Sequence, residues 1–145
     1  MPQPSMEYVN RTIGNGERHA RSLHHTQVTT AHLFVGMLNT IGPVKKVLEQ
    51  SEHRIDLNKA VKALEVVAPS VALMGQVSGH IPHSVSVYGA IDGAIRRAQL
   101  MLHINGPVNE DLLFAILEEG EDIFNELLFE LGITADELRT LFEMN

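Results

Sequence analysis

Histidine is the residue type best suited to chemistry in this sequence, because the chain has eight histidines and no cysteine. The closest groupings are His24-His25 and His80-x-x-His83. A zinc site needs three or four ligands at recognised spacings, and neither pair has a carboxylate or cysteine partner at such a spacing. The sequence therefore predicts structural or surface histidines, with no metal and no cofactor. A histidine metal site is the alternative.

Carboxylates form the second candidate group, with Glu118-Glu119 followed closely by Glu121-Asp122. General acid–base catalysis needs one desolvated carboxyl beside an ionised one in a cleft. These four residues fall at a helix end and in the loop after it, where water screens them. The sequence also lacks the phosphate-binding loop, the nucleophile elbow and the H-E-x-x-H pattern. We predict that the protein is not an enzyme and that it hydrolyses no ATP.

Charge is distributed unevenly along the 145 residues, whose formal net charge is −7. Residues 1–66 hold eight basic and six acidic side chains, whereas residues 67–145 hold three basic and twelve acidic ones. Nucleic-acid binding needs clustered lysine and arginine, so no nucleic-acid partner is expected. The acidic second half would attract basic segments of a protein partner. A solvated acidic surface without a partner is the alternative.

Nothing in the sequence predicts a membrane segment or an exported protein. The longest uncharged stretch, residues 66–91, contains two prolines and two glycines within its first seventeen positions. A spanning helix needs about 20 predominantly apolar residues. The start of the chain, Met1–Ser5, lacks the basic and apolar regions of a secretory signal. We therefore expect no membrane partner and a cytoplasmic location.

Helical spacing of apolar residues dominates the chain, and no long alternating pattern suggests a sheet. One such series runs through Ile91, Ile95, Ala98 and Leu102. Thr134 and Glu137 have the spacing of a capping box. Other residues suited to helix starts and stops are Thr29 or Thr30, Pro43, Asp56, Asn109 and Gly132. The pattern predicts an all-α protein.

The helical pattern occurs twice, at an offset of 80 positions, so that residues 28–35 match residues 108–115. With two residues of slippage, Ile55-Asp56 falls on Ile133-Thr134. One repeat alone buries too little apolar surface. We therefore predict two pseudo-symmetric four-helix repeats packed as one eight-helix domain over residues 1–145. The expected limits are about 6–67 for repeat one, 68–85 for a connector and 86–144 for repeat two.

The predicted connector is more apolar than a solvated linker needs. Its larger apolar residues include Val71, Leu73, Met74 and Ile81. These side chains either pack along the repeats or expose a patch for a partner, and both interpretations stay open. The four residues are therefore candidates for partner binding.

The segment from Ala20 to Leu38 resembles the amino-terminal repeat domain of Clp ATPases. That family has a small-residue helix, a Gly-His turn and the motif Val-x-Thr-Glu-His-Leu-Leu-x-Gly-Leu-Leu, where this chain reads VTTAHLFVGML over residues 28–38. Residues 42–48 are similar to the family's next helix, and residues 126–133 are similar to the corresponding part of the second repeat. The resemblance extends from about Met6 to Phe142.

This resemblance implies a domain without catalysis of its own that sits on an AAA+ unfoldase and passes proteins to the ATPase ring. Its partners would be adaptor proteins, unfolded or marked substrates, and the Clp ATPase or protease ring. The alternative is a stand-alone regulator that senses a small ligand or phosphoarginine. The sequence leaves open whether the chain stands alone or belongs to a larger ATPase.

Family members that bind phosphorylated arginine pair the motif glutamate with a threonine at the start of each repeat's first helix. In the first repeat Ala31 replaces this glutamate, which implies that the site is lost. In the second repeat we assign the motif carboxylate to Asp111, beside Glu110, and the hydroxyl to Ser86 or Ser84. The candidate site is one weakened pocket at Ser86, Glu110 and Asp111, with phosphoarginine disfavoured as its main ligand.

Overall fold

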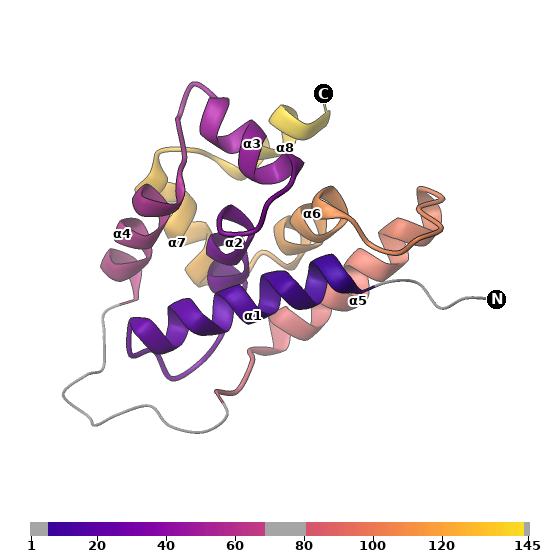
Figure 1. Ribbon diagram of the computed structural model, residues 1–145. Coiled ribbons are helices and arrows are strands. Elements are labelled where there is room, and N and C mark those ends of the chain that lie inside the picture. The colour runs from indigo at the N-terminus through magenta and orange to yellow at the C-terminus, as the bar shows by residue number, and fades with distance from the viewer. Residues whose placement is uncertain (1–5, 69–80, 144–145) are drawn as a thin grey trace.

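The computed structural model describes residues 6–68 and 81–143. Over these ranges the chain forms eight α-helices, and the one strand-like contact is an isolated bridge between Val28 and His83 (Figure 1). No helix in this part of the chain is long and apolar enough to cross a membrane. The all-α prediction is confirmed. The helices are α1 (Glu7–Ser22), α2 (Thr30–Leu38), α3 (Pro43–Gln50), α4 (Leu57–Val67), α5 (Val85–Leu100), α6 (Asn109–Glu119), α7 (Asp122–Leu131) and α8 (Ala135–Glu143).

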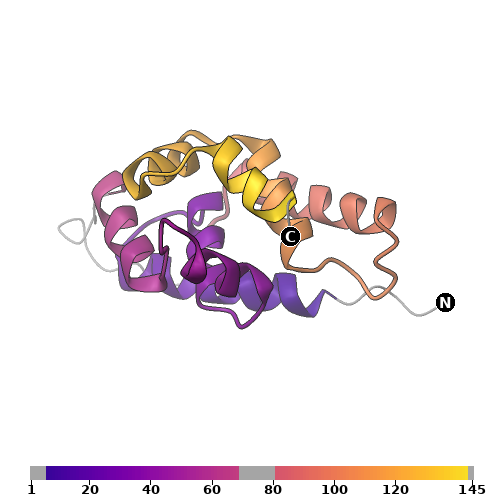
Figure 2. The same ribbon diagram turned by 90° about the horizontal axis from the view of Figure 1, so that it is seen from above.

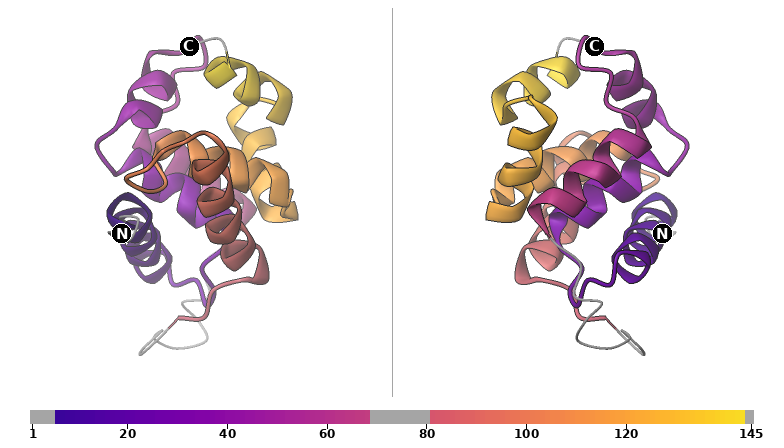
Figure 3. Two further views of the ribbon diagram at one scale, coloured as in Figure 1. Left: turned by 90° about the vertical axis from the view of Figure 1, so that its right-hand side faces the viewer. Right: turned by 90° about the vertical axis from the view of Figure 1, so that its left-hand side faces the viewer.

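Helices α1–α4 and α5–α8 form the two repeats, and α2 lies at the centre of the molecule. All nine residues of α2 are buried, and α2 packs against α1, α3, α4, α5, α6 and α7. Figure 3 shows α1 and α5 at one end of the molecule and α3 and α8 at the other. The two repeats thus share one core, as predicted, and the buried side chains of both belong to a single cluster.

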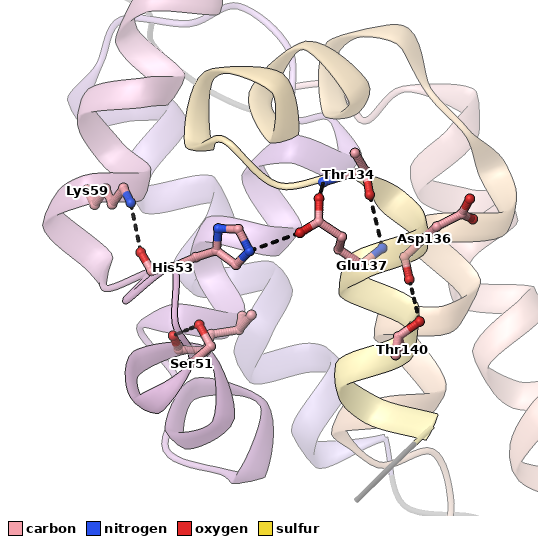
Figure 4. Close-up of polar contacts among 8 residues, drawn as sticks. Ser51, His53, Lys59, Thr134, Asp136, Glu137 and Thr140 are labelled. Atoms are coloured by element: carbon pink, nitrogen blue, oxygen red, sulfur yellow. Dashed lines mark hydrogen bonds and ion pairs between the residues drawn. The ribbon is translucent and has the colours of Figure 1, made fainter.

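Most of the predicted helix ends are confirmed. Asp56 begins α4 by accepting a hydrogen bond from the backbone N–H of Lys59 at 2.8 Å, and Gly132 ends α7 in the left-handed region at φ 77°. Thr134 and Glu137 form the expected capping box, with hydrogen bonds of 3.0 and 3.2 Å (Figure 4). Short polar side chains at these positions satisfy backbone groups that a helix end leaves free.

Asn109 is not the cap of α6, so that prediction was wrong. The residue in the cap position is Val108, and Asn109 is the first helical residue. The carboxylate of Asp111 accepts a hydrogen bond from the backbone N–H of Val108 at 2.9 Å. A carboxylate at the third helical position therefore takes over the polar role that we assigned to the asparagine.

The offset between the repeats also differs from the sequence match. Helices α2 and α6 begin 79 positions apart, at residues 30 and 109, and α1 and α5 begin 78 positions apart. The loop before α6 is one residue longer than the loop before α2. Counted from the helix starts, Glu110 corresponds to Ala31 and Asp111 corresponds to His32. The position of the motif glutamate is therefore held by Glu110, and our assignment to Asp111 was displaced by one residue.

The repeats are joined by polar contacts as well as by the core. Glu137 at the start of α8 meets His53, in the loop before α4, at 3.1 Å (Figure 4). Lys59 donates a hydrogen bond to the backbone carbonyl of the same His53 at 2.8 Å. These contacts fix the start of α4 against the start of α8 at the surface of the molecule.

Candidate functional site

Asp111 is fully buried and has several partners within the chain. Its Oδ1 accepts a hydrogen bond from Arg97 Nη1 at 2.7 Å, and its Oδ2 accepts from His103 Nδ1 at 2.7 Å and from the Val108 N–H. Arg97 also lies over the ring of Phe114, 4.4 Å from its centroid. A carboxylate held in this way is not available to an external guanidinium. It acts as the polar centre that joins α5, the following loop and α6.

The structure does not bring Ser86 to Asp111. Ser86 is half-buried at the second position of α5, whereas Asp111 contacts Arg97 near the other end of that helix. Arg97 lies eleven positions after Ser86, which corresponds to about 16 Å along the helix axis. Glu110 is half-buried at the start of α6, and no hydrogen bond within the described ranges joins it to Ser86. The predicted pocket is therefore not assembled around Asp111.

The connector candidates are only partly described. Ile81 is 2% exposed and belongs to the core. This placement agrees with the packing interpretation for that residue. Val71, Leu73 and Met74 lie outside the described residues.

In the first repeat, the N-terminus of α2 is already occupied by a carboxylate from the other repeat. Glu121 Oε1 accepts hydrogen bonds from the Thr30 N–H at 2.8 Å and from the Thr30 hydroxyl at 2.6 Å. A carboxylate at this end of a helix satisfies free N–H groups and is favoured by the helix dipole. Together with Ala31, this contact leaves no open anion site at the start of α2.

Two histidines of the first repeat form a buried relay. The Thr29 N–H can only donate, so His32 Nδ1, at 2.9 Å, is the acceptor and His32 Nε2 carries the proton. His32 Nε2 therefore donates to His25 Nδ1 at 2.8 Å, and His25 Nε2 donates to the carbonyl of Ala68. Every polar atom of both rings has a partner when both rings are neutral. The structural interpretation of these histidines thus accounts for all their contacts.

Burial, with His25 and His19 nearby, lowers the pKa of His32 to about 3. Burial also lowers the pKa of His25, while the Ala68 carbonyl and Glu65 oppose that shift. Below pH 6.5 these two histidines therefore bind more protons in the unfolded chain than in the folded domain. The free energy of unfolding is therefore highest above pH 6.5, and it falls as the pH drops toward the pKa values of these histidines in the folded domain.

We expect the free energy of unfolding to fall by about 2 kcal/mol from His32 alone between pH 6.5 and 5, at about 1.4 kcal/mol per unit. Urea unfolding at several pH values measures this loss. In His32→Asn the amide oxygen can accept from the Thr29 N–H but does not titrate. The slope of the free energy of unfolding against pH should therefore decrease by the contribution of about one proton. An unchanged slope in the variant would show that His32 is not the residue responsible.

An exposed apolar segment follows α5, and the sequence analysis missed it. Its members Leu100, Leu102 and Ile104 are 82%, 79% and 85% exposed, and Met101 is exposed as well. We call residues 100–104 the α5–α6 apolar segment. We had placed Leu102 at the end of a helical apolar series, but α5 ends at Leu100 and Leu102 adopts the left-handed conformation at φ 59°. Figures 1 and 2 both show this segment at the outer end of the molecule.

In the described ranges, no three His, Cys, Asp or Glu side chains lie close enough together to hold a metal ion. His24 and His25 do not act as a pair, because His24 adopts a left-handed backbone conformation at the surface while His25 enters the relay. His83 contacts Glu17 at 2.8 Å, and His80 lies outside the described residues.

Comparisons with known proteins agree with this architecture. A family model described as the Clp repeat (R) N-terminal domain matches residues 7–131. The N-terminal domain of the caseinolytic protease associated chaperone ClpD from Arabidopsis thaliana is 18% identical, with a TM-score of 0.74 over 97% of this chain and 92% of that one. The Hsp104 N-terminal domain from Candida albicans is 17% identical, with a TM-score of 0.70 over 96% and 89%. At these identities the two structures establish the fold alone. The family match spans most of the chain, which therefore belongs to the Clp repeat N-terminal domain family.

Proposed function

We propose that this domain is a non-catalytic protein-interaction module that recruits adaptor proteins or substrates to a Clp-type AAA+ unfoldase. The observation that carries the proposal is the α5–α6 apolar segment, where four neighbouring large apolar side chains face water. Contiguous exposed apolar surface is typical of protein-binding sites. Fully burying one such side chain contributes about 1.5–3 kcal/mol, so a partner that covers several of them gains substantial affinity.

The shape of the segment favours a folded partner. The segment lies at the outer end of the molecule (Figure 2), and its Leu100, Leu102 and Ile104 side chains are largely exposed, so they would enter a groove on the partner. A folded adaptor has such a groove, whereas an unfolded substrate chain does not. Residues 67–145 hold twelve acidic and three basic side chains, and this overall negative charge would attract a partner with a basic surface.

The double variant Leu102→Gly/Ile104→Ser tests this proposal. We expect at least tenfold weaker binding to a folded Clp adaptor, measured by fluorescence anisotropy, because two apolar anchors are removed. Stability should be preserved, since glycine adopts the left-handed conformation of Leu102 without strain. The matched control is Ile41→Ser, which removes a side chain that is 90% exposed in the α2–α3 loop.

Two outcomes would contradict docking of a folded adaptor on this segment. Equal adaptor affinities of the double variant and the control would exclude the α5–α6 apolar segment as the docking surface. Binding of permanently unfolded casein that the double variant abolishes, with no adaptor binding, would assign the segment to substrates. Thermal unfolding of both variants establishes that the domains compared are equally folded.

A further inference from the structure

A cleft of about 480 Å³ lies between α5, α6 and α8, and it gathers an unusual set of charges. Residues 67–145 contain only three lysines or arginines, which are Arg96, Arg97 and Arg139, and all three line this cleft. The rest of the second repeat is strongly acidic. A volume of this size lies in the range of ligand-binding pockets.

The arginines of the cleft differ in what they already bind. Arg97 is held by Asp111 and by the ring of Phe114. Arg96 and Arg139 form no ion pair with any residue of the described ranges. The Nε atom of Arg139 is buried and has no hydrogen-bond acceptor. A buried N–H group without an acceptor is costly, and a guanidinium is suited to binding a carboxylate through two parallel hydrogen bonds.

On the side of the cleft that α5 forms, two of the lining residues are glycines. A Cβ at Gly89 would lie 2.3 Å from Glu119 Oε1, and one at Gly93 would lie 3.2 Å from the Cβ of Ala115. The position in the first repeat that corresponds to Gly93 is Asn15, whose side chain donates to Thr40 Oγ1 at 2.8 Å and is buried there. The first repeat fills this position with a polar side chain, whereas in the second repeat Ala115 of α6 lies close against the bare backbone of Gly93.

Acidic side chains form the rim. Glu118, Glu119 and Glu143 line the cleft, are exposed, and have no cationic partner in the part of the chain that the structure describes. A ligand that fits both sets of charges carries an anion for the arginines and a cation for the glutamates. The open rim also lets a longer chain leave the cleft.

We propose that this cleft binds the C-terminal end of a peptide, with its α-carboxylate between Arg96 and Arg139 and a basic side chain on the glutamate rim. The peptide's apolar terminal side chain lies against Phe114 and Leu100, which also line the cleft. This inference goes beyond the proposed function, because it assigns a ligand to the cleft, whose lining shares only Leu100 with the α5–α6 apolar segment. It holds whether or not Leu102 and Ile104 bind an adaptor.

Fluorescence anisotropy with a labelled peptide Gly-Ser-Ala-Arg-Leu-Ala tests the proposal, using a free and an amidated C-terminus. The free peptide should bind at micromolar concentration, and the amide should bind at least tenfold more weakly. Arg139→Met and Arg96→Met should each weaken binding of the free peptide at least tenfold. Arg18→Met is the matched control, because Arg18 is the exposed counterpart of Arg96 in α1 and should have no effect.

Several results would overturn the assignment. Equal affinity of the free and amidated peptides would exclude capture of the terminal carboxylate, and so would undetectable binding of the free peptide. Binding of free arginine as tight as that of the peptide would assign the cleft to a small amino acid. Arg96 is exposed, so its substitution leaves the fold intact and keeps the test valid if Arg139→Met alters stability.

Discussion

Asp111→Ala is expected to lower the free energy of unfolding by about 3–5 kcal/mol, the loss typical of removing one member of a buried ion pair. The substitution leaves Arg97 without its carboxylate and His103 and the Val108 N–H without their acceptor. Asp111 is fully buried, so water does not replace the lost oxygens without opening the core. Urea denaturation followed by circular dichroism measures the loss.

Glu110→Ala is the matched control for Asp111→Ala. The two residues are neighbours in the first turn of α6, but Glu110 is half-buried and no hydrogen bond to its side chain is found in the described ranges. Its substitution should change the free energy of unfolding by less than about 1 kcal/mol. Similar losses in the two variants would show that Asp111 is not the polar centre that we describe.

This contrast also decides how a ligand of the second repeat should be tested. A titration with phosphoarginine that relies on Asp111→Ala would confuse loss of a binding group with loss of the fold. Glu110 holds the position of the motif glutamate when the helices are matched by their starts. Glu110→Gln is therefore the informative variant for that titration.

The fold could be predicted because apolar spacing and caps are local signals. Asp56, Gly132 and the pair Thr134–Glu137 act within one helical turn of their own positions. The offset between the repeats could not be fixed in the same way. Leu113 falls on Phe34 at an offset of 79 and on Leu33 at an offset of 80, so this buried apolar series does not by itself fix the offset.

The contacts of the candidate site could not be predicted, because they join residues from different elements. Arg97 reaches Asp111 from α5 and His103 reaches it from the loop. The exposure of Leu102 could not be predicted either. No glycine or proline at that point marks the end of α5, and the helical spacing of apolar residues continues through Leu102.

The two repeats share their helices but not their polar contacts. Glu121 from the second repeat binds Thr30 at the start of α2. The corresponding pair in the other direction is Gly42 and Asn109, where a glycine supplies no side chain and the Asn109 Oδ1 is buried without a partner. A site in one repeat therefore cannot be inferred from its counterpart, and the cleft at Gly89 and Gly93 is a second instance of this difference.

Gly36→Ala is expected to destabilise the domain by about 3 kcal/mol, at the upper end of what overpacking a core costs. An added Cβ would lie 2.5 Å from the Thr12 carbonyl oxygen and 2.9 Å from the Gly16 nitrogen. Both are backbone atoms of α1, so a change of side-chain rotamer cannot relieve the clash. The whole of α1 must move away from α2 to make room.

Gly14→Ala is the control for this substitution, because its Cβ would have no atom within 4 Å. It should stabilise α1 by about 0.5–1 kcal/mol, since alanine is the better helix former. Opposite signs for the two changes, measured by urea denaturation, would identify the helix contact as the cause. A loss below about 1 kcal/mol for Gly36→Ala would mean that α1 can shift freely. The position of α2 would then depend on its other neighbours, and the α1–α2 contact could not be what holds Thr29 and His32 in register for the buried relay.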